Sequence, residues 1–415
     1  MTFRDTDADL LVVGGGNAGA ALALAAAQAG LSVVMLDATP AERRAAPDFD
    51  GRAYALAAAS VRMLEALGVW SAVAARAQTM REIRISDGRI GDPGPVRLRF
   101  EGAALDRAPF AWMLEDRWLR SALLDAVAAD ARIDHRAPAR VATHRAEAGR
   151  AVALLEDGAE VSAPLIAACD GRRSALAARA GIRWSGRRYG QTGLVCAVRC
   201  AEPHDGVARQ IFYPGGPFAI LPLQGEAGAG DVVSLVWSER DAEAARIAAL
   251  DDPGYLAEIA LRMGGVLGDV ALVGRRWAYP LELALAYDYA GDRVAAVGDA
   301  AHAIHPIAGQ GFNLALRDAA ALAETLADGR RRGEDIGAPA TLSRYARWRR
   351  FDSTGLAAAT DGLNRLFSND WTPLRALRDA GLAAVDAVPG LKRAFMTAAA
   401  GLDGDAPRLL QGRRL

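Results

Sequence analysis

The chain has 415 residues and a formal net charge of −1, from 49 basic and 50 acidic side chains. This length is sufficient for two domains. The balanced charge gives no support for a nucleic-acid-binding protein, which needs a strongly basic surface. Three cysteines are too few for a disulfide framework in a chain of this size and indicate a reducing compartment.

The N-terminal region predicts a βαβ unit. We expect a short parallel strand over residues 9–13, an Ala/Leu-rich helix over 17–29 and a second strand over 32–36. Residues 10–36 carry no charge, which is also typical of a transmembrane helix or a signal peptide. The glycines at 14–16 interrupt this run, and aspartates rather than basic residues precede it. We therefore predict a cytoplasmic protein.

The turn of this unit carries a dinucleotide-binding fingerprint, Gly14-x-Gly16-x-x-Gly19. Gly14 permits the tight turn, Gly16 lets the backbone approach a pyrophosphate, and Gly19 allows close packing of helix on strand. Asp37 follows the second strand, where its carboxylate can accept hydrogen bonds from an adenosine ribose. The fingerprint alone does not distinguish NAD from FAD.

The next elements alternate between helices and strands. We expect helices over residues 61–67 and 118–129, then a strand pair over 152–155 and 161–168 around Asp157-Gly158. Strands separated by Pro/Gly turns follow, and they predict an antiparallel sheet over residues 195–198, 208–213, 218–223 and 232–237. Phe212, Phe218, Ile220 and Trp237 face either the core of this sheet or an aromatic pocket, and the pattern does not decide which.

After the predicted antiparallel sheet, the chain again shows a strand, a Gly-rich segment and a helix in succession. A buried strand over 292–297 precedes the segment from Gly298 to Asn313, and a helix over 312–326 follows it. The Gly-rich turn points backbone N–H groups at a ligand, and the helix N-terminus adds partial positive charge. Asp299 can hold a sugar-alcohol hydroxyl. Two such sites far apart in the sequence suit one long cofactor bound at both ends.

Two closely spaced histidines and a helical C-terminal region are the remaining features of the sequence. His302 and His305 are three residues apart, but no third metal ligand accompanies them, and we expect no metal site. Residues 341–415 predict helices, loosely patterned and interrupted by Gly381 and Pro389. We expect these helices to pack on the first domain in preference to forming a membrane-contact surface.

The segment GDAAHAIHPIAGQGFN, from Gly298 to Asn313, resembles the GD motif of class A flavin monooxygenases, in particular the ubiquinone-biosynthesis hydroxylase family. The resemblance covers nearly the whole chain. It includes the run Cys169-Asp170-Gly171-Arg172-Arg173-Ser174, which is similar to the family's DG motif. It also includes strands such as Gly216 to Leu223 and Ser234 to Trp237. Two departures stand out, Asp116 in place of an asparagine and Ala177 where the DG motif has an arginine.

The resemblance implies roles for individual residues. Asp299 would bind the ribityl chain of FAD, and the stretch Pro306 to Gly311, with Gly309 and Gln310, would wrap the isoalloxazine ring. Asn313 and Gly298 belong to the same motif. Arg52 would lie near the flavin and its pyrophosphate, Arg117 could meet phosphate, and Asp170 would lie near the pyrophosphate and the route of the nicotinamide donor. A solvated arginine, a helix-start charge and a plain Asp-Gly turn are the structural alternatives for these last three.

The implied fold is α/β, with a Rossmann-like FAD-binding domain, an inserted antiparallel substrate sheet and a helical C-terminus, like para-hydroxybenzoate hydroxylase. We expect the FAD-binding domain over residues 1–75, 110–185 and 281–340, the substrate domain over 76–109 and 186–280, and the helical region over 341–415.

The implied function is FAD-dependent hydroxylation of a polyprenylated phenol in ubiquinone biosynthesis through a flavin hydroperoxide, with NAD(P)H or a protein donor as reductant and O2 as co-substrate. The cofactor carries this chemistry, so no catalytic side chain is assigned. Membership of a biosynthetic complex and peripheral contact with the inner membrane follow as expectations. A hydroxylase of a small aromatic or a polyketide, and a non-catalytic flavin-binding subunit, remain the alternatives.

Overall fold

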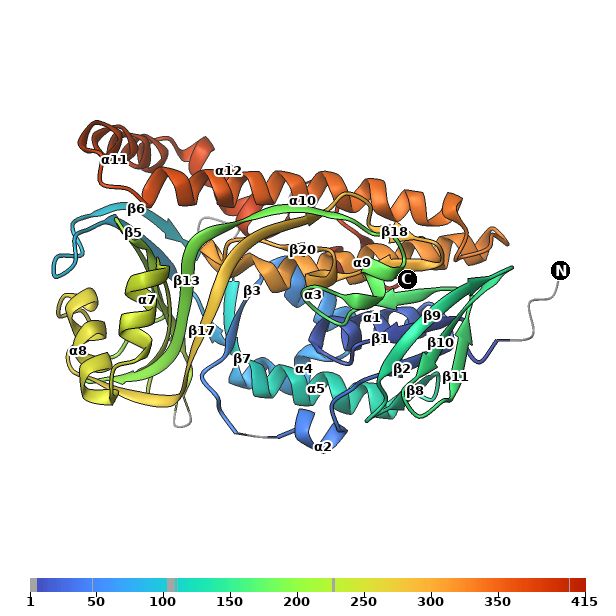
Figure 1. The fold of residues 1–415 in the computed structure, drawn as a ribbon. Coiled ribbons are helices and arrows are strands. Elements are labelled where there is room, and N and C mark those ends of the chain that lie inside the picture. The colour runs from blue at the N-terminus through green and yellow to red at the C-terminus, as the bar shows by residue number, and fades with distance from the viewer. Residues whose placement is uncertain (1–5, 47, 103–108, 110, 226–227, 403) are drawn as a thin grey trace.

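The computed structural model describes residues 6–46, 48–102, 109, 111–225, 228–402 and 404–415. Strands of these residues form four sheets, of six, eight, three and three strands. Figure 1 shows two halves, with the large sheet in one and the nucleotide-type βαβ unit in the other. Helix α10 (Pro339–Phe367) runs along the top of both.

The six-stranded sheet contains the predicted βαβ unit. Its order is β18 (Ala290–Gly291), β19 (Val294–Ala296), β12 (Ile166–Ala168), β1 (Leu10–Val13), β2 (Val33–Leu36) and β8 (Ile133–Arg136). All neighbours are parallel except β18 and β19. The central strands are completely buried, which explains their unbroken apolar runs.

Helices cover this sheet and form its core. Helix α1 (Asn17–Gln28) packs against both α5 (Asp116–Ala129) and α9 (Gln310–Arg331). The contact surfaces are rich in alanine, which lets the helices approach closely. Shorter helices complete this half of the molecule: α2 (Ala41–Arg44), α3 (Ala58–Ala66), α4 (Trp70–Val73) and α6 (Ala175–Arg179).

The eight-stranded sheet combines the regions expected to form the substrate domain. Its order is β20 (His302–Ala303), β17 (Val270–Ala286), β13 (Trp184–Cys200), β16 (Val232–Arg240), β15 (Gly216–Leu223), β14 (Val207–Tyr213), β5 (Glu82–Asp87) and β6 (Val96–Glu101). Neighbours are antiparallel with one exception, because β5 lies parallel to β14. The sheet is therefore mixed, and β13 and β17 cross as long curved strands into the other half (Figure 1).

The two faces of this sheet have different environments. Side chains of one face form a second core with α7 (Asp241–Ala248) and α8 (Asp252–Met263). Because side chains alternate along a strand, the intervening residues face the opposite way. Those residues line a cavity, described below.

Two small sheets differ in part from expectation. Strands β9 (Val141–Glu147), β10 (Arg150–Leu155) and β11 (Glu160–Ala163) form one, and β3 (Ala53–Ala57), β7 (Ala111–Glu115) and β4 (Gln78–Thr79) form the other. The hairpin around Asp157-Gly158 is confirmed. The single strand over 161–168 is wrong, because the chain leaves β11 near Pro164 and enters the parallel sheet as β12. Proline has no N–H group for a continuing ladder.

The C-terminal region is helical, as predicted, but its packing is not restricted to the first domain. Helix α10 packs on α9, whereas α11 (Thr372–Ala387) packs on β6 of the eight-stranded sheet and α12 (Pro389–Ala399) packs on α11. Gly381 lies inside α11 and does not interrupt it.

Among the described helices, no single one is long and apolar enough to cross a membrane, although α3 and the helical stretch Trp70–Arg76 pass that test as a pair bent by 116°. The proposed domain boundary at 109–110 falls among residues 103–110, most of which lie outside the described part.

Candidate functional site

One large cavity lies between the two halves of the molecule. Its volume is about 1080 Å³, just above the range of about 300–1,000 Å³ that is usual for small-molecule sites. The starts of α1 and α9 line one end, and the free face of the eight-stranded sheet lines the other. The cavity therefore brings together the two Gly-rich segments that the sequence separates by about 280 residues.

The fingerprint glycines differ in what a side chain would meet. A Cβ atom at Gly14, where φ is +111°, would lie 2.3 Å from the carbonyl oxygen of Cys169. A Cβ atom at Gly19 would lie 1.9 Å from the carbonyl oxygen of Gly14. At Gly16, which lines the cavity, it would meet nothing within 4 Å. Gly14 and Gly19 therefore shape the protein, and Gly16 leaves open space for a ligand.

Helix α9 presents a second open N-terminus to the same cavity. Its N-cap, Gly309, has φ +63°, and a Cβ atom there would lie 2.9 Å from Cβ of Ala55. A Cβ atom at Gly311 would meet nothing within 4 Å. Pro306, Gly309, Gln310 and Gly311 all line the cavity. Two helix N-termini with unobstructed backbone face one space, which fits an anionic or strongly polar ligand.

Asp299 lies at the mouth of this space. It belongs to the short helix η3 (Gly298–Ala300), which follows β19, and it lines the cavity. Its side chain is 53% exposed, and its ion pair with Arg172 is long, at 3.6 Å from Nε to Oδ2. Its carboxylate is therefore available to a hydroxyl-bearing ligand. Arg172 and Gly171 of the DG motif line the cavity beside it.

Asn313 holds the start of α9 in place. Its side-chain oxygen accepts from the backbone N–H of Ala57 at 2.9 Å and from the hydroxyl of Ser60 at 2.8 Å. Its amide nitrogen donates to the carbonyls of Ala55 and Gly309. These hydrogen bonds engage the side chain of Asn313 within the protein, and through them Asn313 positions the GD segment. Its expected role in cofactor binding stays a prediction.

A buried aspartate anchors the GD motif from behind. Asp318 of α9 accepts from the backbone N–H of Gly298 at 2.9 Å and pairs with His302 at 2.6 Å and Arg349 at 2.6 Å. Burial would raise the pKa of Asp318, but His302 and Arg349 hold it below its ordinary value. His302 is thus explained by its hydrogen bond with Asp318, and the described residues contain no group of three or more potential metal ligands.

A second aspartate organises the wall near α1. Asp116 is buried and accepts from Asn17 at 3.0 Å and from the hydroxyl of Tyr54 at 2.9 Å, and it also pairs with Arg120. Burial and the Asp116 carboxylate raise the pKa of Tyr54, so the hydroxyl stays protonated as a donor. Arg52 lies 3.3 Å from Asp116 and 2.7 Å from Asp50, and it lines the cavity.

Asp37 and Asp170 follow β2 and β12, the two strands that flank β1 in the parallel sheet, and lie at the carboxyl ends of those strands. Asp37 is buried and pairs with Arg44 through distances of 2.5 and 2.9 Å. A Cβ atom at Gly15 would lie 2.6 Å from its carboxylate. Among the described residues that line the large cavity, neither of these aspartates is present. Cys169, which precedes Asp170, does line it.

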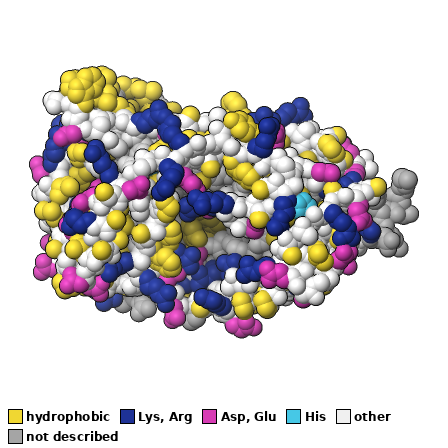
Figure 2. Space-filling view, in the orientation of Figure 1, with side chains coloured by type: hydrophobic (Ala, Val, Ile, Leu, Met, Phe, Trp, Pro, Cys, Tyr) yellow, Lys and Arg dark blue, Asp and Glu magenta, His cyan; other side chains and the backbone are white. Residues whose placement is uncertain are grey.

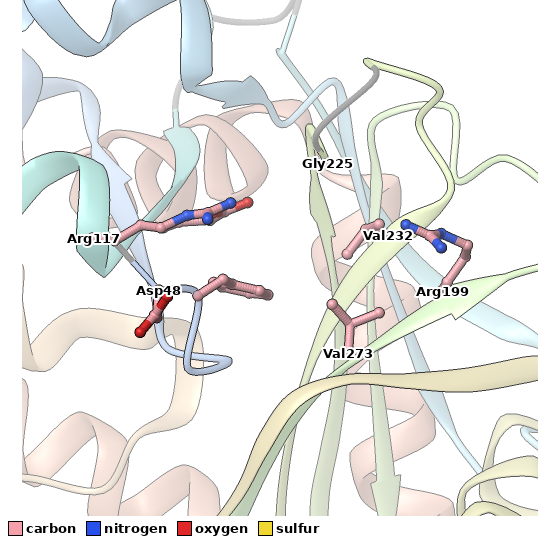
Figure 3. Close-up of a pocket in the computed structure, with 8 residues that line it drawn as sticks. Asp48, Arg117, Arg199, Gly225, Val232 and Val273 are labelled. Atoms are coloured by element: carbon pink, nitrogen blue, oxygen red, sulfur yellow. The ribbon is translucent and has the colours of Figure 1, made fainter. Parts of the chain in front are cut away.

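Arg117 lies elsewhere, in a smaller cavity of about 360 Å³ (Figure 3). It pairs with Glu115 at 2.6 Å and stacks near the rings of Phe49 and Trp118. Figure 3 shows it extending from the start of α5 toward Arg199 and Val232 on the other side. The structure therefore does not bring Arg117 to the large cavity with Arg52.

The sheet end of the cavity is apolar. Phe212 faces it and stacks on Phe367 of α10, with ring centroids 4.0 Å apart. Phe218, Ile220 and Trp237 face the other way, into the core with α7 and α8. Successive side chains along a strand point to opposite faces of the sheet, so the register of each strand decides which of these residues face the cavity and which face the core. Side chains of β5, β6 and β15 extend the apolar lining: Ile83, Ile85, Leu98, Phe100, Ala219 and Leu221.

Comparisons with known proteins show which family the sequence resembles. A family model described as "FAD binding domain" matches residues 7–351. The chain is 41% identical over 411 residues to ubiquinone hydroxylase UbiL of Rhodospirillum rubrum, covering 98% of this chain and 94% of that protein. It is 34% identical over 405 residues to 3-demethoxyubiquinol 3-hydroxylase of Escherichia coli strain K12, covering 97% and 100%.

Solved structures agree on the fold. The crystal structure of p-nitrophenol 4-monooxygenase PnpA from Pseudomonas putida has a TM-score of 0.79 with this chain, covering 97% of this chain and 99% of that one. Its sequence identity is 20%, so the likeness bears on the fold alone. It confirms the expected α/β fold class.

Proposed function

The chain belongs to the ubiquinone-biosynthesis family of FAD-dependent hydroxylases, and we propose that it hydroxylates the aromatic ring of a polyprenylated phenol at the junction of its two halves. The observation that carries the proposal is the pair of open helix N-termini, at Gly16 and Gly311, which face one cavity with an apolar far end. This arrangement supports a long polar cofactor at one end and an apolar substrate at the other.

We assign the cofactor end to FAD from the chemistry of the lining. The N-terminus of α1 would hold the pyrophosphate, and Asp299 would hold the ribityl hydroxyls. The expected role of Asp37 at the ribose stays a prediction, because Asp37 pairs with Arg44 and does not line the cavity. The stretch Pro306 to Gly311 would lie against the ring. When bound, FAD supplies the electron transfer and oxygen chemistry, with NAD(P)H or a protein donor as reductant and O2 as co-substrate.

The protein's part is binding, orientation and exclusion of water. Asn313 and Asp318 fix the start and the back of the GD segment through hydrogen bonds to backbone. The N-terminal end of α9 places partial positive charge beside the ring position, which favours negative charge there. The apolar sheet face holds the phenol ring near that point and keeps solvent away. No side chain is assigned as an acid or base.

The lining also supports the substrate class. The sheet end offers Ile, Leu and Phe side chains and few polar groups, which suits a prenyl tail better than a small carboxylic acid. We further propose that the substrate is delivered at a membrane, with peripheral contact by the protein. Because the relatives are named for hydroxylation steps of ubiquinone biosynthesis, we also propose that the protein assembles with other enzymes of that biosynthesis.

A substrate comparison tests the function. The flavin-loaded chain, supplied with NADH or NADPH and O2, is expected to hydroxylate a prenylated phenol in detergent and to act weakly on 4-hydroxybenzoate. Product is measured by mass spectrometry and peroxide release in parallel. Hydroxylation of the small acid alone would replace this proposal with a small-aromatic hydroxylase. Peroxide without either product, or no flavin reduction, would favour a non-catalytic flavin-binding subunit.

The role of Asp299 has a separate test with a matched control. Asp299→Ala removes a half-exposed carboxylate whose protein partner is the long contact with Arg172, so FAD affinity should fall at least about tenfold with little change in unfolding. The control is Asp328→Ala, which removes a partly exposed aspartate of α9 that does not line the cavity and should leave FAD affinity unchanged. Full FAD occupancy in Asp299→Ala would remove Asp299 from the site.

A further inference from the structure

Exposed apolar side chains are concentrated in one part of the C-terminal region. Of the eleven large hydrophobic side chains that are exposed among the described residues, seven lie between residues 351 and 395. Six of these form what we call the apolar rim: Leu363, Trp371, Leu377, Val388, Leu391 and Phe395. Figure 2 shows hydrophobic side chains gathered at the end of the molecule where α11 lies in Figure 1. Exposed apolar groups gathered in this way mark an interaction surface.

The rim is continuous with the large cavity. Leu363, Leu377 and Phe395 are exposed and at the same time line the cavity. Leu382 and Val385 of α11 continue the apolar lining inward. A path of apolar side chains therefore leads from the outer surface, between α11 and α12, to the sheet end of the proposed substrate site.

The helices of the rim are fastened to the sheet from inside. Arg378 of α11 is buried, and its guanidinium pairs with Asp87 of β5 through distances of 2.6 and 2.9 Å. It also donates to the carbonyls of Leu366 and Asn369 and lies over the ring of Phe367. These contacts of Arg378 fix α11 against the sheet, so the exposed apolar side chains of the rim stay on the outer surface.

The charge pattern around the rim fits an anionic surface. Residues 361–395 contain four aspartates, and each of them is paired with a basic side chain: Asp361 with Arg365, Asp370 with Arg89, Asp379 with Arg97 and Asp386 with Lys392. The same residues contain five basic side chains, Arg365, Arg375, Arg378, Lys392 and Arg393, so basic groups outnumber acidic ones there. Basic side chains next to exposed apolar ones are typical of helices that lie in a lipid headgroup layer, where an exposed tryptophan also favours the interface.

From these observations we infer that the apolar rim docks on an anionic lipid bilayer and that the opening between α11 and α12 admits the substrate's tail directly from it. The inference rests on the proposed function for the nature of the substrate. A bilayer leaves the opening continuous with a reservoir of apolar molecules, whereas a protein seated on Leu377 and Phe395 would close it.

A vesicle-binding experiment tests the inference with the flavin-loaded full chain. The rim variant carries Trp371→Ser, Val388→Ser and Leu391→Gln, three exposed positions that do not line the cavity. The matched control carries Leu261→Gln and Tyr287→Ser, which are exposed at 49% and 54% on other elements. Co-sedimentation is measured with phosphatidylcholine vesicles, with and without phosphatidylglycerol. FAD content and light scattering report folding and oligomeric state.

The wild type and the control should bind vesicles, more tightly when phosphatidylglycerol is present, and the rim variant should bind at least tenfold more weakly with unchanged FAD content. The rim variant should also retain turnover of a short-tailed phenol in solution and lose it with a long-tailed phenol in vesicles. The inference is overturned by a wild type that does not bind, by equal binding of the rim variant, or by a change from dimer to monomer as the variant's sole effect. Vesicle binding without any hydroxylation would refute the proposed function and leave the docking surface intact.

Discussion

Gly16 and Gly19 lie three residues apart, yet a side chain would have opposite consequences at the two positions. At Gly16 the backbone is extended, with φ −70°, and a Cβ atom points into open cavity space. We therefore expect Gly16→Val to fold normally and to lose FAD affinity at least about tenfold, because the side chain occupies the space of the pyrophosphate. Flavin fluorescence titration measures the loss.

Gly19→Val is the matched comparison, because its Cβ atom would meet the carbonyl of Gly14 at 1.9 Å. This variant should be destabilised or fail to fold, as followed by circular dichroism and chemical denaturation. Unchanged FAD affinity in Gly16→Val, or normal stability in Gly19→Val, would contradict this division between ligand space and packing.

His305 gives a prediction about pH. Its ring is completely buried, and neither nitrogen has a hydrogen-bond partner among the described residues; the ring lies edge-on to Tyr189 at 5.1 Å. Burial lowers the pKa of His305 to about 4, from 6.5. Between these two pH values the unfolded chain binds a proton on His305, whereas the folded chain keeps the ring neutral. Protonation therefore favours the unfolded state, and the free energy of unfolding falls as pH falls from about 6.5 towards about 4.

The measurement is the free energy of unfolding of the wild type and of His305→Leu at about pH 7 and about pH 5. The wild type should lose about 2 kcal/mol more than the variant over this interval. Other titrating groups affect both proteins alike, so the difference isolates His305. Parallel pH dependences would show that the imidazole is hydrated or partnered in solution.

At the residue scale, the sequence predicted positions that depend on local backbone and missed those that depend on distant partners. The fingerprint glycines are recognisable because the strand, turn and helix that require them are contiguous. Asn313 finds Ala57 and Ser60 more than 250 positions away, and nothing near it in the sequence signals that contact. Asp116 was visible as a departure from the family pattern, but its partners Asn17 and Tyr54 were not.

Helices α9 and α10 are joined by a buried ion pair between Asp318 and Arg349, and both side chains are fully buried. Arg349→Met should lower the free energy of unfolding by about 3–5 kcal/mol, because it leaves the Asp318 carboxylate buried with less compensation. Chemical denaturation measures the change. Arg145→Met breaks an exposed pair with Glu160 and should have little effect. Equal losses in the two variants would show that burial of the pair is unimportant.

The elements themselves were predictable to different degrees for physical reasons. Strands β1 and β2 and helix α1 have uniform patterns because each is buried on all sides or along one face. Strand β20 was not predicted, because two residues of the GD segment pair with β17 only when the whole fold is assembled. The tail was predicted as helix, but its attachment to β6 depends on ion pairs such as Arg97 with Asp379, which no local pattern reveals.

At the scale of the molecule, the cavity joins two halves with different chemistry. Backbone N–H groups of α1 and α9 supply the polar end, and the eight-stranded sheet and α11 supply the apolar end. The sequence indicated two modules and the cofactor, since each module has its own pattern. It did not indicate that α11 lines the apolar end, because that depends on how the tail folds back over the sheet.

This division predicts how affinity depends on the prenyl tail. An isoprene unit adds five carbon atoms, and each fully buried CH2 group stabilises binding by about 0.8 kcal/mol, so complete burial of one unit would tighten Kd by up to about a thousandfold. We therefore expect each added unit to tighten Kd by at least about tenfold while it lies inside the cavity. Beyond the opening beside Leu377 and Phe395 the tail leaves the protein, and further units should add little in detergent. A series of phenols with increasing tail length, titrated by flavin fluorescence, measures the slope and its end.

The turnover number should vary little along the same series, because the ring binds at the flavin end whatever the length of the tail. A variant with a polar group in the apolar end, Leu98→Gln, should flatten the slope and leave FAD affinity unchanged, since Leu98 lines the sheet end of the cavity. Affinity independent of tail length in the wild type would place the tail outside the cavity. It would also remove the physical reason for an apolar passage that runs from the sheet to the surface of α11 and α12.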